Sequence, residues 1–282
     1  MITSTIENLP KATAQITITI IWDEVKESYQ KIFNRVVNDS EIAGFRKGKA
    51  PKKLIEDKID KTKIYEEVVK EIIPNAYGKA VQEQKIRPVS SPKIEVIKAK
   101  ENENWVIKAT VALKPTVKLK NYKEKIKELK QSKTKIWTPG SDPKKEEEKK
   151  PTVDEIVRVL LAEAEVELSE ILVTDEANRL LTGLIDQTQK LGMTVEQYLL
   201  AKGKTTEQLR AEYALQASNN LKIEFIINEI AETEKITVTQ EDLDKLISKA
   251  EKPEERENLK KESYYLAHLI RQQKTFDFLN SL

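Results

Sequence analysis

The sequence predicts an α+β domain followed by an all-α domain, and the distribution of proline is the first observation behind this division. The chain has 282 residues, a length that suits about two domains of ~150 residues each. Nine of the ten prolines lie at or before Pro151, so the 131 residues that follow can be almost wholly helical. With only 7 glycines and 34% charged residues, the composition is typical of long, solvated helices.

Charge is the second observation, because its sign differs between the two ends of the chain. Residues 1–115 hold 21 basic and 16 acidic side chains, residues 116–150 hold 12 and 6, and residues 151–282 hold 16 and 25. Different partners for the basic and acidic parts would explain this contrast, and so would a chance difference between solvated helices. Turn-forming and charged residues fill 138–150 without one large apolar side chain. We therefore predict domains at 1–115 and 151–282, joined by a charged linker or arm at 116–150 that is exposed over 138–150. The sequence leaves open whether Lys118–Lys135 forms an extended arm or a helix.

The first domain is predicted to pack helices on one face of an antiparallel sheet. Ile16, Ile18 and Ile20 alternate with threonines, which is the period of a half-buried strand. The apolar spacing then changes to that of helices. Helices are predicted at 23–39, from Pro51 to Ile59 and at 64–81, and further strands at 94–96 and 105–113. This order of elements is typical of an α+β domain.

The second domain has helical apolar spacing throughout. Helix starts are predicted at Thr174, Thr194, Thr205, Thr239 and Pro253. Thr194 and Thr205 each stand three residues before a glutamine, which is the spacing of a capping box. The last helix is expected to bury Leu269 and one of its two tyrosines, Tyr264 or Tyr265.

Several classes of chemistry are excluded by residues that the chain lacks. It has no cysteine, which rules out disulfides, thiol catalysis and zinc sites built on sulfur. Its single histidine, His268, falls on the apolar stripe of the last helix, where we expect a packed or hydrogen-bonded side chain rather than a catalytic one. Neither of the common glycine-rich phosphate-binding motifs occurs in the sequence. We expect no catalytic residue, no metal and no cofactor.

The sequence also predicts a soluble, cytoplasmic protein that does not act at a membrane. No apolar run approaches the ~18–20 residues that cross a bilayer. The residues from Met1 to Lys11 lack the basic and apolar regions of a secretory signal.

One short segment stands out for function. Residues 46–53 carry five cations and no acid, and the glycines at 44 and 48 let the backbone turn back on itself. This pattern predicts a projecting loop with Phe45 at its tip, because an exposed aromatic ring beside cations is typical of a docking anchor. The alternative is a plain basic turn whose Phe45 packs into the core. The candidate docking residues are Gly44, Phe45, Arg46, Lys47, Gly48 and Lys49.

The segment from Gly44 to Pro51 resembles the ribosome-docking signature of trigger factor, the bacterial ribosome-associated chaperone family. Other segments of the first domain agree, namely Leu9–Lys11, Tyr65–Glu67, Ile73–Tyr77 and Ala109–Pro115. In the second domain, residues 171–176, 193–199, 203–210 and 236–243 are similar to the family's helical, substrate-cradling domain. The resemblance covers about 1–120 and 152–250, which is most of the chain.

The resemblance implies an ATP-independent holdase that docks at the nascent-chain exit of the large ribosomal subunit, on protein and rRNA. Its second partner would be unfolded nascent polypeptides, and a weak homodimer is left open. The family usually carries an FKBP-like prolyl isomerase domain between the two matching parts. Only 35 residues separate Pro115 from Pro151 here, fewer than the ~50 of a small domain. We therefore expect a form that lacks the isomerase and is not an enzyme.

Client binding is expected in the helical domain. A cradle for unfolded chains should expose scattered apolar side chains rimmed by charge, so that many sequences bind weakly. The candidates near helix ends are Leu191, Met193, Tyr198 and Leu199, and for each the alternative is a core residue.

Two other functions compete with this interpretation. A ribosome-independent holdase resembling the SurA-type periplasmic chaperones would use a helical domain similar to 152–250. The absent signal peptide and the loop from Gly44 to Gly48 argue against it. A basic RNA-binding protein acting through residues 1–135 would need aromatic side chains among its cations, and Phe45 is the one that fits.

Overall fold

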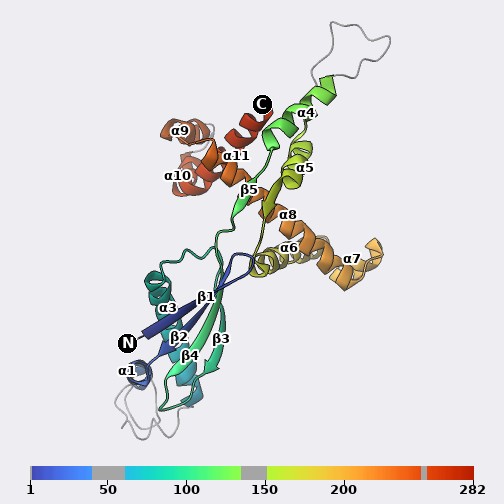
Figure 1. Cartoon of the computed structure of the whole chain (residues 1–282). Helices are drawn as coiled ribbons and strands as arrows, with labels where there is room; N and C mark the ends of the chain where they lie inside the picture. The colour runs from blue at the N-terminus through green and yellow to red at the C-terminus, as the bar shows by residue number, and fades with distance from the viewer. Residues whose placement is uncertain (1, 40–60, 135–150, 249–252) are drawn as a thin grey trace, which may run out of the picture. The chain divides into compact units, whose positions relative to one another are not determined.

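The computed structural model describes residues 2–39, 61–134, 151–248 and 253–282 (Figure 1). The chain forms two compact units, Met1–Lys114 and Pro115–Leu282, here called unit 1 and unit 2. The helix predicted from Pro51 to Ile59 lies outside the described residues.

Unit 1 contains a four-stranded antiparallel sheet in the order β1-β2-β4-β3. Its strands are β1 (Ile2–Leu9), β2 (Thr13–Ile20), β3 (Lys93–Lys98) and β4 (Trp105–Ala112). The sequence analysis missed β1, because Ser4 separates the two apolar residues, Ile2 and Ile6, on its inner face. The tight connection to β2 places Lys11 and Ala12 at positive φ.

Two helices, α1 (Trp22–Asp39) and α3 (Lys61–Glu83), pack against one face of this sheet (Figure 1). The alternating isoleucines of β2 are fully buried beneath them, as their spacing predicts. Val25 and Ile32 of α1 and Val68 of α3 are buried in the same core. The first domain is therefore α+β, which confirms the predicted fold class.

Unit 2 begins with a strand and a helix in the region that the sequence analysis assigned to a charged linker or arm. β5 (Val117–Leu119) pairs with β6 (Ala164–Val166), and α4 (Tyr122–Thr134) packs against α5 (Val153–Glu163). Of the two alternatives left open for Lys118–Lys135, the structure shows a helix from Tyr122 to Thr134, and this part of the predicted linker or arm belongs to unit 2. The physical reason is that the side chains of Tyr122 and Ile126 are buried in the core of unit 2.

The rest of unit 2 is helical. Its helices are α6 (Glu170–Lys190), α7 (Val195–Lys202), α8 (Thr206–Thr233), α9 (Gln240–Ser248), α10 (Pro253–Lys261) and α11 (Ser263–Ser281). Thr194 and Thr205 cap α7 and α8 through complete capping boxes, as predicted. Thr174 does not cap a helix, because α6 begins earlier, with Ser169 as its N-cap.

The single last helix predicted from Pro253 is two helices, separated at Glu262. The one large apolar residue of α10 is Leu259. α10 therefore has too few apolar side chains to extend the apolar face of α11. Unit 2 is therefore largely helical, as predicted. It also contains a short two-stranded sheet that the sequence analysis did not predict.

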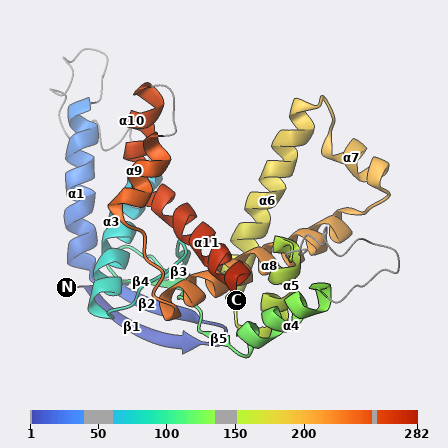
Figure 2. The same ribbon diagram turned by 90° about the horizontal axis from the view of Figure 1, so that it is seen from above.

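The helices of unit 2 form a base and two arms (Figure 2). The base is built on one buried cluster: Tyr122, Ile126, Ile156, Leu160, Ile226, Ile230 and Leu279. We call α6, α7 and the first half of α8 arm A, because α6 packs along α8. We call α9, α10 and α11 arm B, in which each helix contacts the other two.

Candidate functional site

The predicted docking loop, from Gly44 to Lys49, lies outside the described residues. The structure describes α1 and α3, the helices that precede and follow residues 40–60. The rings of Tyr29 and Tyr65 lie 4.9 Å apart, and Lys31 Nζ lies 2.7 Å from Glu71 Oε1. The hydrogen bond from Lys31 lowers the pKa of the Glu71 carboxyl. The segment 40–60 thus begins and ends on helices that pack against each other.

Arm A ends in the short helix α7, and the residues that cap this helix determine where it begins and ends. The Thr194 hydroxyl accepts a hydrogen bond from the backbone N–H of Gln197 at 3.2 Å, and Gly203 ends the helix with φ of 61°. A left-handed residue at this position favours glycine, which has no Cβ. None of the eight residues of α7 is fully buried, so the helix keeps its apolar side chains at the surface.

The predicted client-binding residues all lie at this end of arm A. Leu191, the C-cap of α6, is 75% exposed, which rules out the alternative that it is a core residue. Met193, Tyr198 and Leu199 are half-buried. The sequence analysis missed Leu200, which is 82% exposed. The sequence did contain an indication of this exposure. Tyr198, Leu199 and Leu200 are consecutive, and consecutive residues of a helix cannot all face the core.

Arm B carries a second group of exposed apolar side chains, Tyr264, Tyr265 and Leu269, on the first half of α11. Tyr264 is 92% exposed. The prediction that Leu269 and one of the tyrosines are buried is therefore wrong. α11 turns Leu266 and Leu279 inward instead, and the two tyrosines lie on its first turn, beside the break at Glu262.

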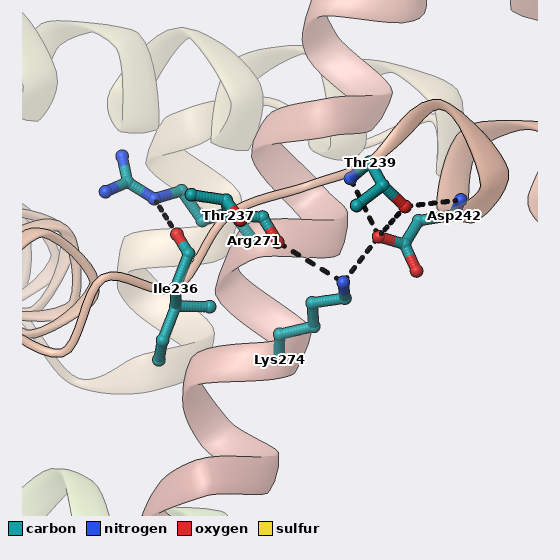
Figure 3. Close-up of polar contacts among 6 residues, drawn as sticks. All are labelled: Ile236, Thr237, Thr239, Asp242, Arg271 and Lys274. Carbon is teal, nitrogen blue, oxygen red and sulfur yellow. Dashed lines mark hydrogen bonds and ion pairs between the residues drawn. The ribbon is translucent and has the colours of Figure 1, made fainter.

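A joint between α9 and α11 holds arm B together (Figure 3). The Lys274 ammonium donates a hydrogen bond to the Asp242 carboxylate and another to the Thr237 carbonyl at 3.3 Å. Asp242 Oδ2 also accepts from the Thr239 backbone N–H at 2.8 Å and from its hydroxyl at 2.9 Å. Arg271 Nε donates to the Ile236 carbonyl at 3.1 Å. We call these residues the α9–α11 joint.

The hydrogen bonds of the α9–α11 joint lower the pKa of the Asp242 carboxyl. The hydrogen bond from Lys274, followed by those from Thr239, holds the pKa of Asp242 far below its ordinary value. Asp242 is therefore charged in the folded chain, and this charge ties the start of α9 to α11.

A second polar group ties α4 to the end of α8. The Tyr122 hydroxyl donates to Glu234 Oε1 at 3.1 Å, and Lys123 Nζ lies 2.7 Å from the same oxygen. Burial and the neighbouring Glu234 carboxylate raise the pKa of Tyr122. The signal for α4 was the spacing of Tyr122, Ile126 and Leu129 among lysines, which places three apolar side chains on one helix face.

The described residues hold no group of three or more His, Asp or Glu side chains placed to bind a metal ion. His268 is half-buried, and its Nε2 lies 3.0 Å from Gln272 Nε2, so the predicted hydrogen-bonded role is confirmed. Within the described ranges no helix is both long and apolar enough to span a membrane.

Comparison with known families gives two matches. "Bacterial trigger factor protein (TF)" matches residues 2–139, and "Bacterial trigger factor protein (TF) C-terminus" matches residues 125–280. The second match alone spans more than half of the chain. The chain belongs to the trigger factor family. This finding confirms the resemblance that the segment from Gly44 to Pro51 indicates.

Individual trigger factors are similar over part of their length. That of Shouchella clausii (strain KSM-K16) is 32% identical over 204 residues, which are 71% of this chain and 44% of the relative. That of Pelotomaculum thermopropionicum is 35% identical over 118 residues, 42% of this chain and 27% of the relative. The chain thus matches less than half the length of these curated trigger factors.

A solved trigger factor structure shares the fold. It is described as "Promiscuous Substrate Recognition in Folding and Assembly Activities of the Trigger Factor Chaperone". The superposition has a TM-score of 0.63 and covers 99% of both chains, with 12% sequence identity. Trigger factor architecture is therefore retained here in a chain of very different sequence.

Proposed function

We propose that this chain is an ATP-independent chaperone of the cytoplasm that docks at the nascent-chain exit of the large ribosomal subunit and shields unfolded polypeptides. The observation that carries the proposal is membership of the trigger factor family through both its N-terminal and C-terminal models. The docking signature from Gly44 to Pro51 supports the ribosomal part of the proposal, because Phe45 can fill an apolar recess while Arg46 and Lys47 bind carboxylates or phosphates.

The holdase part rests on unit 2. Its exposed large apolar side chains among the described residues are Val153, Ile185, Leu191, Leu200, Leu215, Tyr264, Tyr265 and Leu269. Most of them lie on the two arms, separated by charged residues. Dispersed apolar contacts of this kind bind many sequences weakly, which suits a client that has no fixed structure. Met193, Tyr198 and Leu199, which are half-buried beside Leu200, extend the proposed client surface of arm A.

We further propose that the chain has no prolyl isomerase activity. The two family matches overlap at 125–139, so they leave no unmatched stretch between them. Part of the region where the family usually carries the isomerase is occupied here by β5 and α4. We expect a proline-limited refolding assay to show the same rate with and without the protein. An acceleration that a prolyl isomerase inhibitor abolishes would contradict this expectation.

The docking proposal is tested by co-sedimentation with ribosomes. We expect the triple variant Phe45→Ala, Arg46→Glu, Lys47→Glu to lose ribosome binding, because it removes the apolar anchor and reverses two charges. Binding of the unchanged chain should also fall steeply as salt rises, since contacts with RNA phosphates release counterions.

The matched control for docking reverses two exposed cations elsewhere in unit 1, Lys26→Glu with Lys79→Glu, and should sediment like the unchanged chain. Circular dichroism checks that the triple variant is folded. If the folded triple variant still sediments with ribosomes, the docking role is wrong. If the unchanged chain suppresses aggregation without binding ribosomes at all, it is a ribosome-independent holdase.

A further inference from the structure

The sheet of unit 1 has two outer strands, β1 and β3, and in the described residues each of them pairs with one neighbouring strand. Among the described residues β3 pairs with β4 alone, so its outer row of backbone N–H and C=O groups is free to pair with another strand. The exposed large apolar side chains of unit 1, within the described ranges, all lie on this edge or just before it: Val89, Val96 and Ile97. Val96 is 51% exposed and Ile97 is 56% exposed.

The opposite edge, β1, is contacted at Ser4 by residues at the end of α3. Ile2 and Ile6 are half-buried and pack against the core of unit 1. Gln84 Nε2 donates to the backbone carbonyl of Ser4 at 3.1 Å, and the Ser4 hydroxyl donates to Glu83 Oε2 at 2.6 Å. Residues at the end of α3 thus occupy part of the β1 edge, whereas in the described part of the chain no side chain is hydrogen-bonded to a backbone group of β3.

The register shows what an added strand would meet. Ile94 lies opposite Ala109, and Val96 lies opposite Ile107. Directly opposed residues share a face of the sheet, so Ile94 and Val96 lie on the face that α1 and α3 cover. Ile94 is half-buried there, but Val96 is exposed. Apolar side chains of a fifth strand would therefore continue an apolar layer that now stops at Val96.

Charge decides which strand this edge would accept. Residues 85–100 carry five exposed cations and one exposed acid, Glu95. The cations are Lys85, Arg87, Lys93, Lys98 and Lys100. Lys98 pairs with Glu103 at 2.7 Å. Two copies of this edge would bring like charges together, which opposes self-pairing. An acidic segment would be attracted.

We propose that β3 binds an extended segment of an unfolded client chain by strand addition, and that the preferred segment has alternating apolar side chains and acidic flanks. This inference rests on the proposed chaperone function. The backbone supplies hydrogen bonds that do not depend on the client's sequence, and the apolar and basic side chains supply the preference. The register of β3 breaks between Val96 and Lys98, so the regular edge is short and the bound segment should exchange quickly.

The test uses the full chain and a synthetic peptide with six alternating valines and threonines between pairs of aspartates. Hydrogen exchange followed by NMR should show outward-facing amides between Lys93 and Val96 slowed on peptide binding, by about tenfold. The same peptide with N-methyl groups on alternate residues cannot form the ladder and should bind at least about tenfold more weakly. A peptide with lysine flanks should also bind more weakly.

Two variants separate the contributions of the edge. Val96→Ser with Ile97→Ser should weaken binding of the acidic peptide, and Lys93→Glu with Lys100→Glu should reverse the preference between acidic and basic flanks. Lys26→Glu with Lys79→Glu applies the same charge change elsewhere in unit 1 and should leave this preference unchanged. Equal binding of the N-methylated peptide, or protection confined to other residues, would overturn strand addition.

The outcome also distinguishes this inference from the proposed function. If the chain does not suppress aggregation of unfolded proteins but the peptide still protects β3, the chaperone function is wrong and the edge site stands. If aggregation is suppressed and the β3 amides stay unprotected, the edge site alone is wrong.

Discussion

Asp242 and Lys274 show how one ion pair can position the apolar surface of an arm. Lys274 lies on α11, which also carries Tyr264 and Tyr265, and Asp242 lies on the first turn of α9. Their contact joins α9 to α11, and Arg271 of α11 also bonds the Ile236 carbonyl in the segment that leads into α9. At the scale of single residues, polar contacts away from Tyr264 and Tyr265 thus help to hold the helix that carries them.

The pKa of Asp242 leads to a prediction about acid stability. Because its pKa is lowered in the folded chain, the pair stabilises the fold above the ordinary Asp pKa of ~3.9, and this contribution is lost as the pH falls through the folded pKa. We expect Lys274→Met to lower the melting temperature of unit 2 by a few degrees at pH 7. The difference from the unchanged chain should shrink below about pH 4.

The control is Lys274→Arg, which keeps the positive charge and should melt close to the unchanged chain. Thermal unfolding followed by circular dichroism at several pH values measures both variants. A difference that stays constant from pH 7 to pH 3 would mean that the ion pair does not stabilise arm B.

At the scale of helices and strands, an element was predicted correctly where its apolar residues recur at a regular spacing. β2 and β4 alternate regularly and were predicted, whereas β1 has a serine between its inner isoleucines and was missed. Capping boxes at Thr194 and Thr205 were found because their chemistry is local. α4 was left open between a helix and an extended arm, because its few apolar residues stand among lysines and a high local charge is equally typical of a linker.

The position of α4 in the core of unit 2 is tested by Ile126→Ala. Ile126 is fully buried, so its truncation leaves a cavity and should lower the free energy of unfolding by about 2–5 kcal/mol. Urea unfolding followed by circular dichroism measures the change. Lys127→Ala, at the neighbouring exposed position of the same helix, should cost well under about 1 kcal/mol. Equal stability of the two variants would place this segment outside the core.

At the scale of the whole molecule, the distribution of proline and charge predicted the division into two units. It did not predict which apolar side chains are exposed. Whether Leu200 or Tyr264 is buried depends on which helices pack nearby, and the spacing of apolar residues within one helix does not contain that information. The same spacing made Leu269 look like a core residue. The docking loop between Gly44 and Lys49 stays a prediction from sequence.

At this scale we predict that client shielding needs both arms. Leu191→Ser with Leu200→Ser, or Tyr264→Ser with Tyr265→Ser, should each raise several-fold the chaperone concentration that suppresses half of the aggregation of an unfolded client. Contacts on two arms reinforce each other when one client chain reaches both. Light scattering measures the suppression.

The stability of these variants should be nearly unchanged, since the substituted side chains are exposed. Val153→Ser removes an exposed apolar side chain from the base instead and should suppress aggregation like the unchanged chain. If it impairs suppression as much as the arm variants do, the arms have no special role.

The packing of α4 against α5 has a consequence for how such chains can gain or lose parts. Both helices contribute to the buried cluster of unit 2, through Ile126 on α4 and Ile156 on α5. The polypeptide between Thr134 and Pro151 therefore departs from and rejoins the same core. Genetic insertion or deletion within that interval changes no side chain of this cluster, so an extra module could be gained or lost there while the cluster keeps its composition.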